Sequence, residues 1–195
     1  MVESDFDWGC ANDWVREVIG SEVFGNKIYE RVFRVEDGEI VVDVGASLGP
    51  FGYSIDKSIH HYYALEPSKD FFPTLEKNMQ SKSFPSTCIQ KAIANGSSPN
   101  IEVWGNYPKN QFEWMNVPTI TFEDFIKEYE IDEIDFLKLD CEGGEYDIFT
   151  PENFSWIYKN VRKIAGEWHL ASPQRKHKFA KFRDLYLVNF DNVQV

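Results

Sequence analysis

Ionisable side chains recur at every second position in the segment KLDCE, residues 138–142. In an extended strand Lys138, Asp140 and Glu142 would share one face, although we expect the strand to end near Asp140 and Glu142 to fall in the following turn. A lysine inside a buried strand costs free energy unless it is paired, so Lys138 needs a partner or a chemical role. The two carboxylates are candidate proton acceptors, and a buried ion pair followed by a capped turn is the structural alternative.

Another candidate base ends the apolar segment VRKIAGEWH, residues 161–169. Glu167 and His169 would share one face of a strand, and the unperturbed pKa of histidine lies near neutrality, which suits a general base. A histidine that only satisfies local hydrogen bonds is an equally good interpretation. Three carboxylates and His169 could also hold a divalent metal, but no H-x-x-x-H or H-x-D spacing supports such a site, and we predict no metal.

A third chemical signal is the segment EIVVDVGASLGPFG, residues 39–52. Asp43 interrupts an aliphatic run, and Gly45 and Gly49 follow in the layout of a tight turn into a helix. In open parallel sheets such a turn lies at the carboxyl edge of the strands, where ligands bind. An ordinary glycine turn would look the same, so the segment by itself indicates only a nucleotide-like ligand.

The glycine spacing favours one cofactor class over another. A dinucleotide site has the pattern G-x-G-x-x-G, whose second glycine lets the pyrophosphate approach the backbone. Here the pattern is G-x-x-x-G-x-x-G, and Ser47 stands where that glycine would be. S-adenosylmethionine has no pyrophosphate, and Asp43 would suit the ammonium of its aminoacyl end. Glu66, after the next apolar run, could accept the ribose hydroxyls of either cofactor, although an exposed glutamate before a turn is the alternative.

The elements that must position these residues alternate along the chain after residue 39. Apolar runs of strand length and periodic segments of helix length predict an α/β fold, a doubly wound, mostly parallel sheet with helices on both faces. The predicted strands are residues 40–44, 61–66, 87–93, 135–140 and 161–169, with a short strand, NVQV, at the end. The predicted helices are residues 50–58, 69–80, 121–130 and 172–187, and residues 101–105 and 112–120 form a predicted hairpin.

The first 34 residues predict a helical cap in two pieces, residues 12–19 and 21–33. Asn12 or Asp13 could cap the first piece and Ser21 the second. Residues 35–195 would form the main domain. A chain of 195 residues suits one compact unit overall.

Composition excludes several function classes. The net charge of −12 opposes binding to nucleic acid or to acidic membrane surfaces. No apolar run approaches the roughly 18 residues that a membrane span needs, and the acidic N-terminus lacks the layout of a signal peptide. Three widely spaced cysteines suit free thiols in a reducing compartment. We therefore expect a cytoplasmic location.

Four segments, in this order and spacing, resemble the FkbM-type methyltransferases, a family of class I S-adenosylmethionine-dependent enzymes. The segments are IVVDVGASLGPF, YALEPSKDFFPTLEKNM, ITFEDF and DFLKLDCEGGEYDIF. The phrase LKLDCEGGE looks like the family signature K-[IL]-D-x-E-G-x-E and is the most specific of them. The resemblance runs from about residue 35 to about residue 169.

The resemblance implies a Rossmann-like class I methyltransferase fold and methyl transfer to a hydroxyl oxygen of a small acceptor, such as a sugar or a secondary metabolite. The cofactor-lining residues that it implies are Asp43, Gly45, Ala46, Ser47 and Gly49 at the methionine end, Glu66 at the ribose, Ala92 beside the adenine, and Asp140 towards the methyl. The expected proton acceptor is Asp140 or Glu142, with His169 as the third candidate. An NAD-linked oxidoreductase and a non-catalytic cofactor-binding or interaction module are the alternatives.

One departure from the family concerns the last strands. Only the short segment NVQV follows the last predicted helix, so the antiparallel strand pair that closes class I folds would be incomplete. An open sheet edge can pair with another chain, and we expect a homodimer as one outcome.

Overall fold

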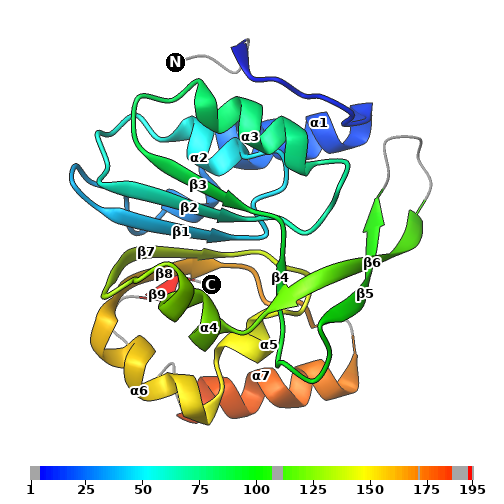
Figure 1. Ribbon diagram of the computed structural model, residues 1–195, viewed down its shortest axis with the longest axis vertical. Helices are drawn as coiled ribbons and strands as arrows, with labels where there is room; N and C mark the ends of the chain where they lie inside the picture. Colours follow the sequence, from blue (N-terminus) through cyan, green and yellow to red (C-terminus); the bar gives the residue numbers. More distant parts are fainter. Residues whose placement is uncertain (1–4, 107–111, 171, 186–192, 195) are drawn as a thin grey trace.

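The centre of the fold is a six-stranded sheet in which every neighbouring pair of strands is parallel (Figure 1). The structure is a computed structural model that describes residues 5–106, 112–170, 172–185 and 193–194. The strand order is β3-β2-β1-β7-β8-β9. The strands are β1 (Ile40–Val44), β2 (His61–Leu65), β3 (Ser86–Ile89), β7 (Ile134–Leu139), β8 (Val161–Gly166) and β9 (Val193–Gln194).

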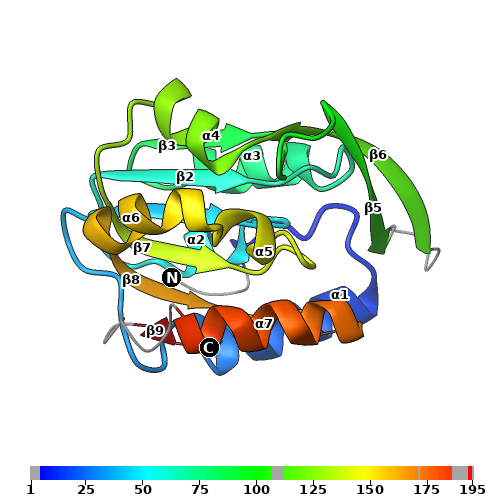
Figure 2. The same ribbon diagram turned by 90° about the horizontal axis from the view of Figure 1, so that it is seen from below.

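Helices cover both faces of this sheet, as Figures 1 and 2 show. One face carries α1 (Asp13–Ile19), the π-helical turn η2 (Gly20–Gly25), the 3₁₀ turn η3 (Ile28–Glu30), α2 (Pro50–Ser54) and α3 (Phe72–Gln80). The other face carries α4 (Phe122–Glu128), α5 (Glu145–Ile148), α6 (Pro151–Asn160) and α7 (Pro173–Leu185). The predicted α/β class with a doubly wound sheet is confirmed. Among the described helices, none has both the length and the hydrophobicity to cross a membrane.

Alternating side chains of the central strand divide the core into two clusters. Val41 packs with α1, α2, α3 and the turns η2 and η3 on one face, whereas Val42 and Val44 pack against α4, α6 and α7 on the other. Val41, Val42 and Val44 are at most 2% exposed, because strands of a parallel sheet are covered on both sides. Asp43 lies on the Val41 face, where it is also completely buried.

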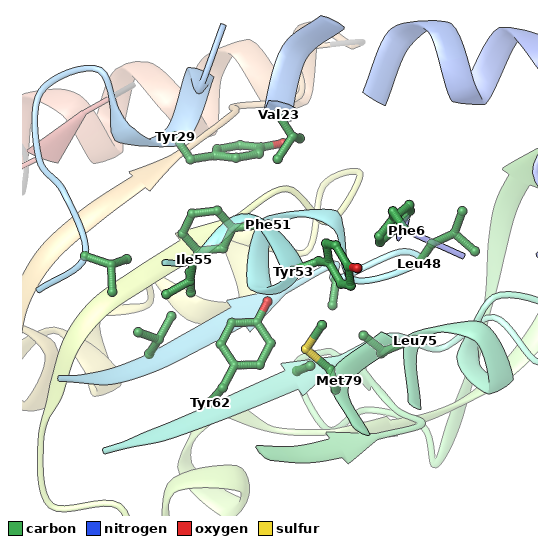
Figure 3. Close-up of a cluster of buried hydrophobic side chains, with 14 of the residues drawn as sticks. Phe6, Val23, Tyr29, Leu48, Phe51, Tyr53, Ile55, Tyr62, Leu75 and Met79 are labelled. Carbon is green, nitrogen blue, oxygen red and sulfur yellow. The ribbon is translucent and has the colours of Figure 1, made fainter. Parts of the chain in front are cut away.

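The N-terminal segment packs into the first of these clusters. Figure 3 shows Phe6, Val23 and Tyr29 beside α2 and the strands, and all three are buried. Asn12 caps α1 as predicted, because its side chain accepts from the Val15 amide at 2.8 Å. The predicted helix over residues 21–33 with a Ser21 cap is wrong: η2 and η3 replace it, and Lys27 separates them in a left-handed conformation at φ 47°.

A smaller sheet, ordered β4-β6-β5, stands beside the main one. It consists of β4 (Ala92–Ile93), β5 (Asn100–Asn106) and β6 (Phe112–Ile120), and β5 and β6 form the predicted antiparallel hairpin. The predicted strand over residues 87–93 is therefore wrong as a single element. Because β3 is the edge strand of the main sheet, the chain can leave it after Ile89 and pair again with β6 as β4.

Two further elements differ from the prediction. The strand predicted over residues 161–169 ends at Gly166, and the Glu167 amide still donates to the Leu139 carbonyl of β7 at 2.9 Å. The helix α6 was not predicted, although Thr150 and Pro151 carry its start signal: the Thr150 hydroxyl accepts from the Asn153 amide, and Pro151 occupies the first turn. Among the described strands of the main sheet none is antiparallel, and β9 lies at the edge beside β8.

The chain reverses its direction of travel across the sheet at β1, and this places the two chemical segments together. From β1 the chain proceeds through β2 to β3 and then returns to β7 on the other side of β1. Ligands of open parallel sheets bind outside the carboxyl ends of the strands at such a switch point. Gly45 and Asp140 follow β1 and β7 there, and a Cβ on Gly45 would lie 1.8 Å from the Asp140 carbonyl oxygen.

This contact predicts a specific loss of stability in Gly45→Ala, with Gly38→Ala as its control. Both glycines have φ 81°, but nothing lies within 4 Å of a Cβ on Gly38. The control should lose only the cost of a left-handed alanine, roughly 1–2 kcal/mol. Gly45→Ala should lose about 1–3 kcal/mol more, because the backbone of the Asp140 turn must move. Urea unfolding of both variants measures the difference, and equal losses would contradict the close approach.

Candidate active site

A buried ion pair lies at the centre of the switch point. Asp43 of β1 and Lys138 of β7 are register partners, and Lys138 Nζ lies 2.9 Å from Asp43 Oδ1. The other Asp43 oxygen accepts from the Tyr62 hydroxyl at 2.5 Å, and Lys138 Nζ also donates to the Gly45 carbonyl at 2.7 Å. Burial opposes the charged lysine, but the carboxylates of Asp43 and then Asp140 outweigh it and raise the pKa of Lys138. The partner that the sequence required for Lys138 is thus Asp43.

The glycine loop, residues 45–49 between β1 and α2, follows Asp43 and packs against neighbouring strands and helices of the protein. The amides of Gly45 and Ala46 both donate to the Leu65 carbonyl at 3.0 Å. Gly49 adopts φ 83°, and a Cβ there would lie 2.8 Å from the Leu75 side chain. The glycines at 45 and 49 are therefore required by close packing inside the protein as well as by the turn.

Glu66 lies behind the glycine loop and is fixed by it. Its two carboxylate oxygens accept from the amides of Ser47 at 2.8 Å and Ser68 at 2.7 Å, and Ser47 itself has φ 53°. Glu66 is only 7% exposed, and burial raises its pKa to about 7 although the two amides favour the ionised form. Glu66 lies beside the glycine loop. That its carboxylate binds the ribose hydroxyls stays a prediction.

Asp140 occupies the turn after β7 and is held by a residue of the N-terminal segment. The Tyr29 hydroxyl donates to Asp140 Oδ2 at 2.5 Å across a separation of 111 residues. The ring of Tyr29 also lies over Lys138, whose Nζ is 5.0 Å from the ring centroid. Burial and then the Asp140 charge raise the pKa of Tyr29, so its hydroxyl stays a donor. Sequence reasoning did not find Tyr29, because no local pattern marks it.

His169 contacts three carboxylates at the same edge. Its Nδ1 lies 2.7 Å from Glu145 Oε1, and its Nε2 lies 3.6 Å from Asp140 Oδ1 and 3.5 Å from Glu142 Oε2. Glu145 is completely buried. The hydrogen bond with Glu145 raises the pKa of His169 to about 9 against the opposing effect of burial.

Glu145 is the second functional residue that sequence reasoning missed. It is the last glutamate of the phrase LKLDCEGGE. The sequence therefore contained the residue within the family signature, but nothing in it indicated that Glu145 would contact His169. Glu142, by contrast, lies in the turn as predicted, with φ 56° and a side chain 77% exposed. The Arg175 guanidinium of α7 holds this turn by donating to the Glu142 carbonyl at 2.8 Å.

The structure brings most of the predicted site residues to one edge of the sheet. Gly45, Ala46, Ser47, Gly49 and Glu66 lie on the β1 and β2 side of the switch point, and Asp140, Glu142 and His169 lie on the β7 and β8 side. Asp43 differs, because it is 0% exposed and both its oxygens contact protein groups. Its direct contact with a ligand ammonium stays a prediction.

Ala92, the predicted neighbour of adenine, is half-buried in β4. The carbonyl of the adjacent Ile93 approaches the Asp140 turn, since a Cβ on Gly144 would lie 3.3 Å from it. The short strand β4 therefore borders the same edge of the sheet, and the contact of Ala92 with a base stays a prediction.

The elevated pKa of Glu66 predicts a pH dependence of folding. A carboxyl group whose folded pKa lies above its unfolded value of 4.5 stabilises the fold at low pH, and this contribution is lost as the pH rises through about 7. We expect Glu66→Gln to remove that loss, which amounts to about 1–3 kcal/mol. Unfolding free energies of the wild type and Glu66→Gln across this range measure it. Exposed Glu102→Gln is the control, and parallel profiles for all three proteins would contradict the burial of an ionisable Glu66.

Comparison with protein-family models shows the family of the chain. Residues 43–191, more than half of the chain, match the methyltransferase FkbM domain. No curated protein matches the chain. A solved structure described as a proposed RNA methyltransferase from Pyrococcus horikoshii is similar over 75% of this chain and 55% of its own, with 14% identity and a TM-score of 0.39. The chain thus spans about half the length of that protein. By the extent of the domain match, the chain belongs to the FkbM methyltransferase family.

Proposed function

We propose that this chain is an S-adenosylmethionine-dependent methyltransferase that methylates a hydroxyl oxygen of a small acceptor, such as a sugar or a secondary metabolite. The observation that carries the proposal is the contact between two turns. The glycine loop after β1, with Glu66 behind it, meets the Asp140 turn after β7 at Gly45. The proposed nucleoside site and the candidate proton acceptors would therefore be neighbours at one sheet edge.

The residues present fit the proposed cofactor. Each oxygen of Glu66 holds one backbone amide, and an ionised carboxylate has lone pairs for further donors such as ribose hydroxyls. Ser47 replaces the glycine that a pyrophosphate would need. Asp140, Glu142 and Glu167 place negative charge at the edge where a sulfonium would lie. When bound, S-adenosylmethionine would supply a methyl group already activated by that sulfonium.

The chain's own residues would position the acceptor and remove its proton. Tyr29 holds Asp140 by Oδ2, which leaves Oδ1 to accept the proton of an acceptor hydroxyl. His169, oriented by Glu145, lies 3.6 Å from that oxygen and would hold the carboxylate in place. Orientation of the reacting groups can supply about 7–11 kcal/mol at its upper limit, so the positioning contacts matter as much as the base.

Calorimetric titration of the purified chain with S-adenosylmethionine and then with NAD tests the cofactor. We expect one molecule of the first to bind with a micromolar dissociation constant and the second not to bind. Binding of NAD alone would indicate an oxidoreductase, and binding of neither would indicate an interaction module. Either result would overturn the proposal.

Asp140→Asn tests the base. The variant keeps the size of the side chain and its bond to Tyr29, so the cofactor should bind within a few-fold of the wild type. Turnover with a panel of hydroxylated acceptors and methyl-labelled cofactor should fall by about 10²–10⁴. Exposed Asp132→Asn, which lies before β7 and so at the opposite end of that strand from the Asp140 turn, should keep both properties. Unchanged turnover in Asp140→Asn would remove Asp140 from the mechanism.

A further inference from the structure

Three side chains with metal-binding atoms converge at the ends of β7 and β8. The ligand atoms of Asp140, Glu167 and His169 all lie within 4.8 Å of one another. Metal bonds of about 2.0–2.2 Å place ligand atoms about 3 Å apart when adjacent and about 4.4 Å apart when opposite. Small side-chain rotations would therefore bring these three atoms around one ion.

His169 and Asp140 are each oriented by a partner that contacts the atom pointing away from the other two side chains. Glu145 Oε1 contacts His169 Nδ1 at 2.7 Å, so the free Nε2 faces Asp140 Oδ1. The Tyr29 hydroxyl holds Asp140 Oδ2 at 2.5 Å, so Oδ1 faces His169. Metal-binding histidines and carboxylates are typically held in this way by hydrogen bonds on the atom that does not touch the metal.

The buried state of Glu145 is an independent observation that points to a cation. Glu145 is 0% exposed, it is directed at His169, and its Oε2 has no hydrogen-bond partner. A carboxylate in such a place costs free energy unless a positive charge lies close to it. A positive charge on the His169 imidazole offsets this cost: a proton carries it in the metal-free protein, and a metal ion on Nε2 would carry it in the loaded protein.

Negative charge around the three side chains exceeds what the nearby cations offset. Glu22 from η2 lies close enough to be repelled by both Glu167 and Asp140, and Glu142 lies 3.5 Å from His169 Nε2. Of the nearby lysine and arginine side chains, Lys138 is engaged by Asp43 and the Gly45 carbonyl, and Arg175 donates to a backbone carbonyl.

We propose that Asp140 Oδ1, the Glu167 carboxylate and His169 Nε2 form a site for a divalent cation with open coordination positions. Two carboxylates and one imidazole suit an ion of the class of Mn²⁺ better than Ca²⁺, which prefers oxygen ligands only. The expectation of no metal relied on spacing within one segment, whereas these ligands come from two strand ends. The open positions would bind the acceptor hydroxyl and lower its pKa. With Asp140 Oδ1 on the ion, the hydroxyl proton would pass to Glu142, the other expected proton acceptor, and only this role rests on the proposed function.

Titration of the chelator-treated full chain with Mn²⁺, followed by electron paramagnetic resonance, tests the site without cofactor or acceptor. We expect one bound ion in the wild type. Glu167→Gln and His169→Gln should weaken binding at least about 10-fold, and Glu145→Gln by about 10–100-fold, because the orienting carboxylate is lost. Glu152→Gln on α6 is an exposed control that should bind like the wild type. Thermal unfolding checks that each variant is folded, and the exposed Glu167 is the substitution least expected to disturb folding.

No bound Mn²⁺ in the wild type, or equal affinity in the wild type, Glu167→Gln and His169→Gln, would overturn the site. The test of the metal site and the test of the proposed function can fail independently. S-adenosylmethionine binding to the chelator-treated protein tests the function alone, and Mn²⁺ binding without cofactor tests the metal site alone.

Discussion

The buried ion pair between Asp43 and Lys138 determines how the two functional turns meet. Removing two charges from water costs several kcal/mol per ion, and a buried pair is tolerated only when further hydrogen bonds satisfy it. Here the Tyr62 hydroxyl satisfies Asp43, and the Gly45 carbonyl satisfies Lys138. One lysine thus connects β1, β7 and the glycine loop. The register that makes Asp43 and Lys138 neighbours also makes Gly45 and Asp140 neighbours two residues further along the two strands.

Around this centre, each reactive side chain is held by a residue from a different part of the chain. Tyr29 reaches Asp140 from the N-terminal segment, Glu145 orients His169 from α5, and Arg175 fixes the Glu142 turn from α7. The N-terminal segment therefore does more than cover a face of the sheet. It packs Phe6 and Val23 into the core and delivers a hydroxyl to the site through Tyr29.

The sequence was sufficient for features whose signal is local. Alternating apolar runs predicted the parallel sheet, Asn12 predicted a helix start, and the segment LKLDCEGGE predicted a charged turn beyond β7. The placement of that turn beside the glycine loop followed from the rule that parallel strands end at one edge. Even the need of Lys138 for a partner could be predicted, because an unpaired buried lysine costs too much free energy.

Features that depend on distant contacts could not be predicted. Tyr29 has no pattern of its own, and its partner lies 111 residues away. The break between η2 and η3 at Lys27 and the transfer of β4 to the second sheet both result from tertiary packing that overrides local preference. The convergence of Glu167 and His169 with Asp140 arises only because β8 ends early, at Gly166, so that both residues lie in the loop next to Asp140.

The central claim is that the carboxyl edge at β1 and β7 binds the cofactor. An experimental structure with S-adenosylhomocysteine bound tests it most directly. We expect ribose hydroxyls on the Glu66 carboxylate and the sulfur atom outside the point where the Gly45 and Asp140 turns touch. A ligand bound instead in the hollow between β4, β6 and α4, lined by Lys91, Thr119 and Glu128, would contradict it.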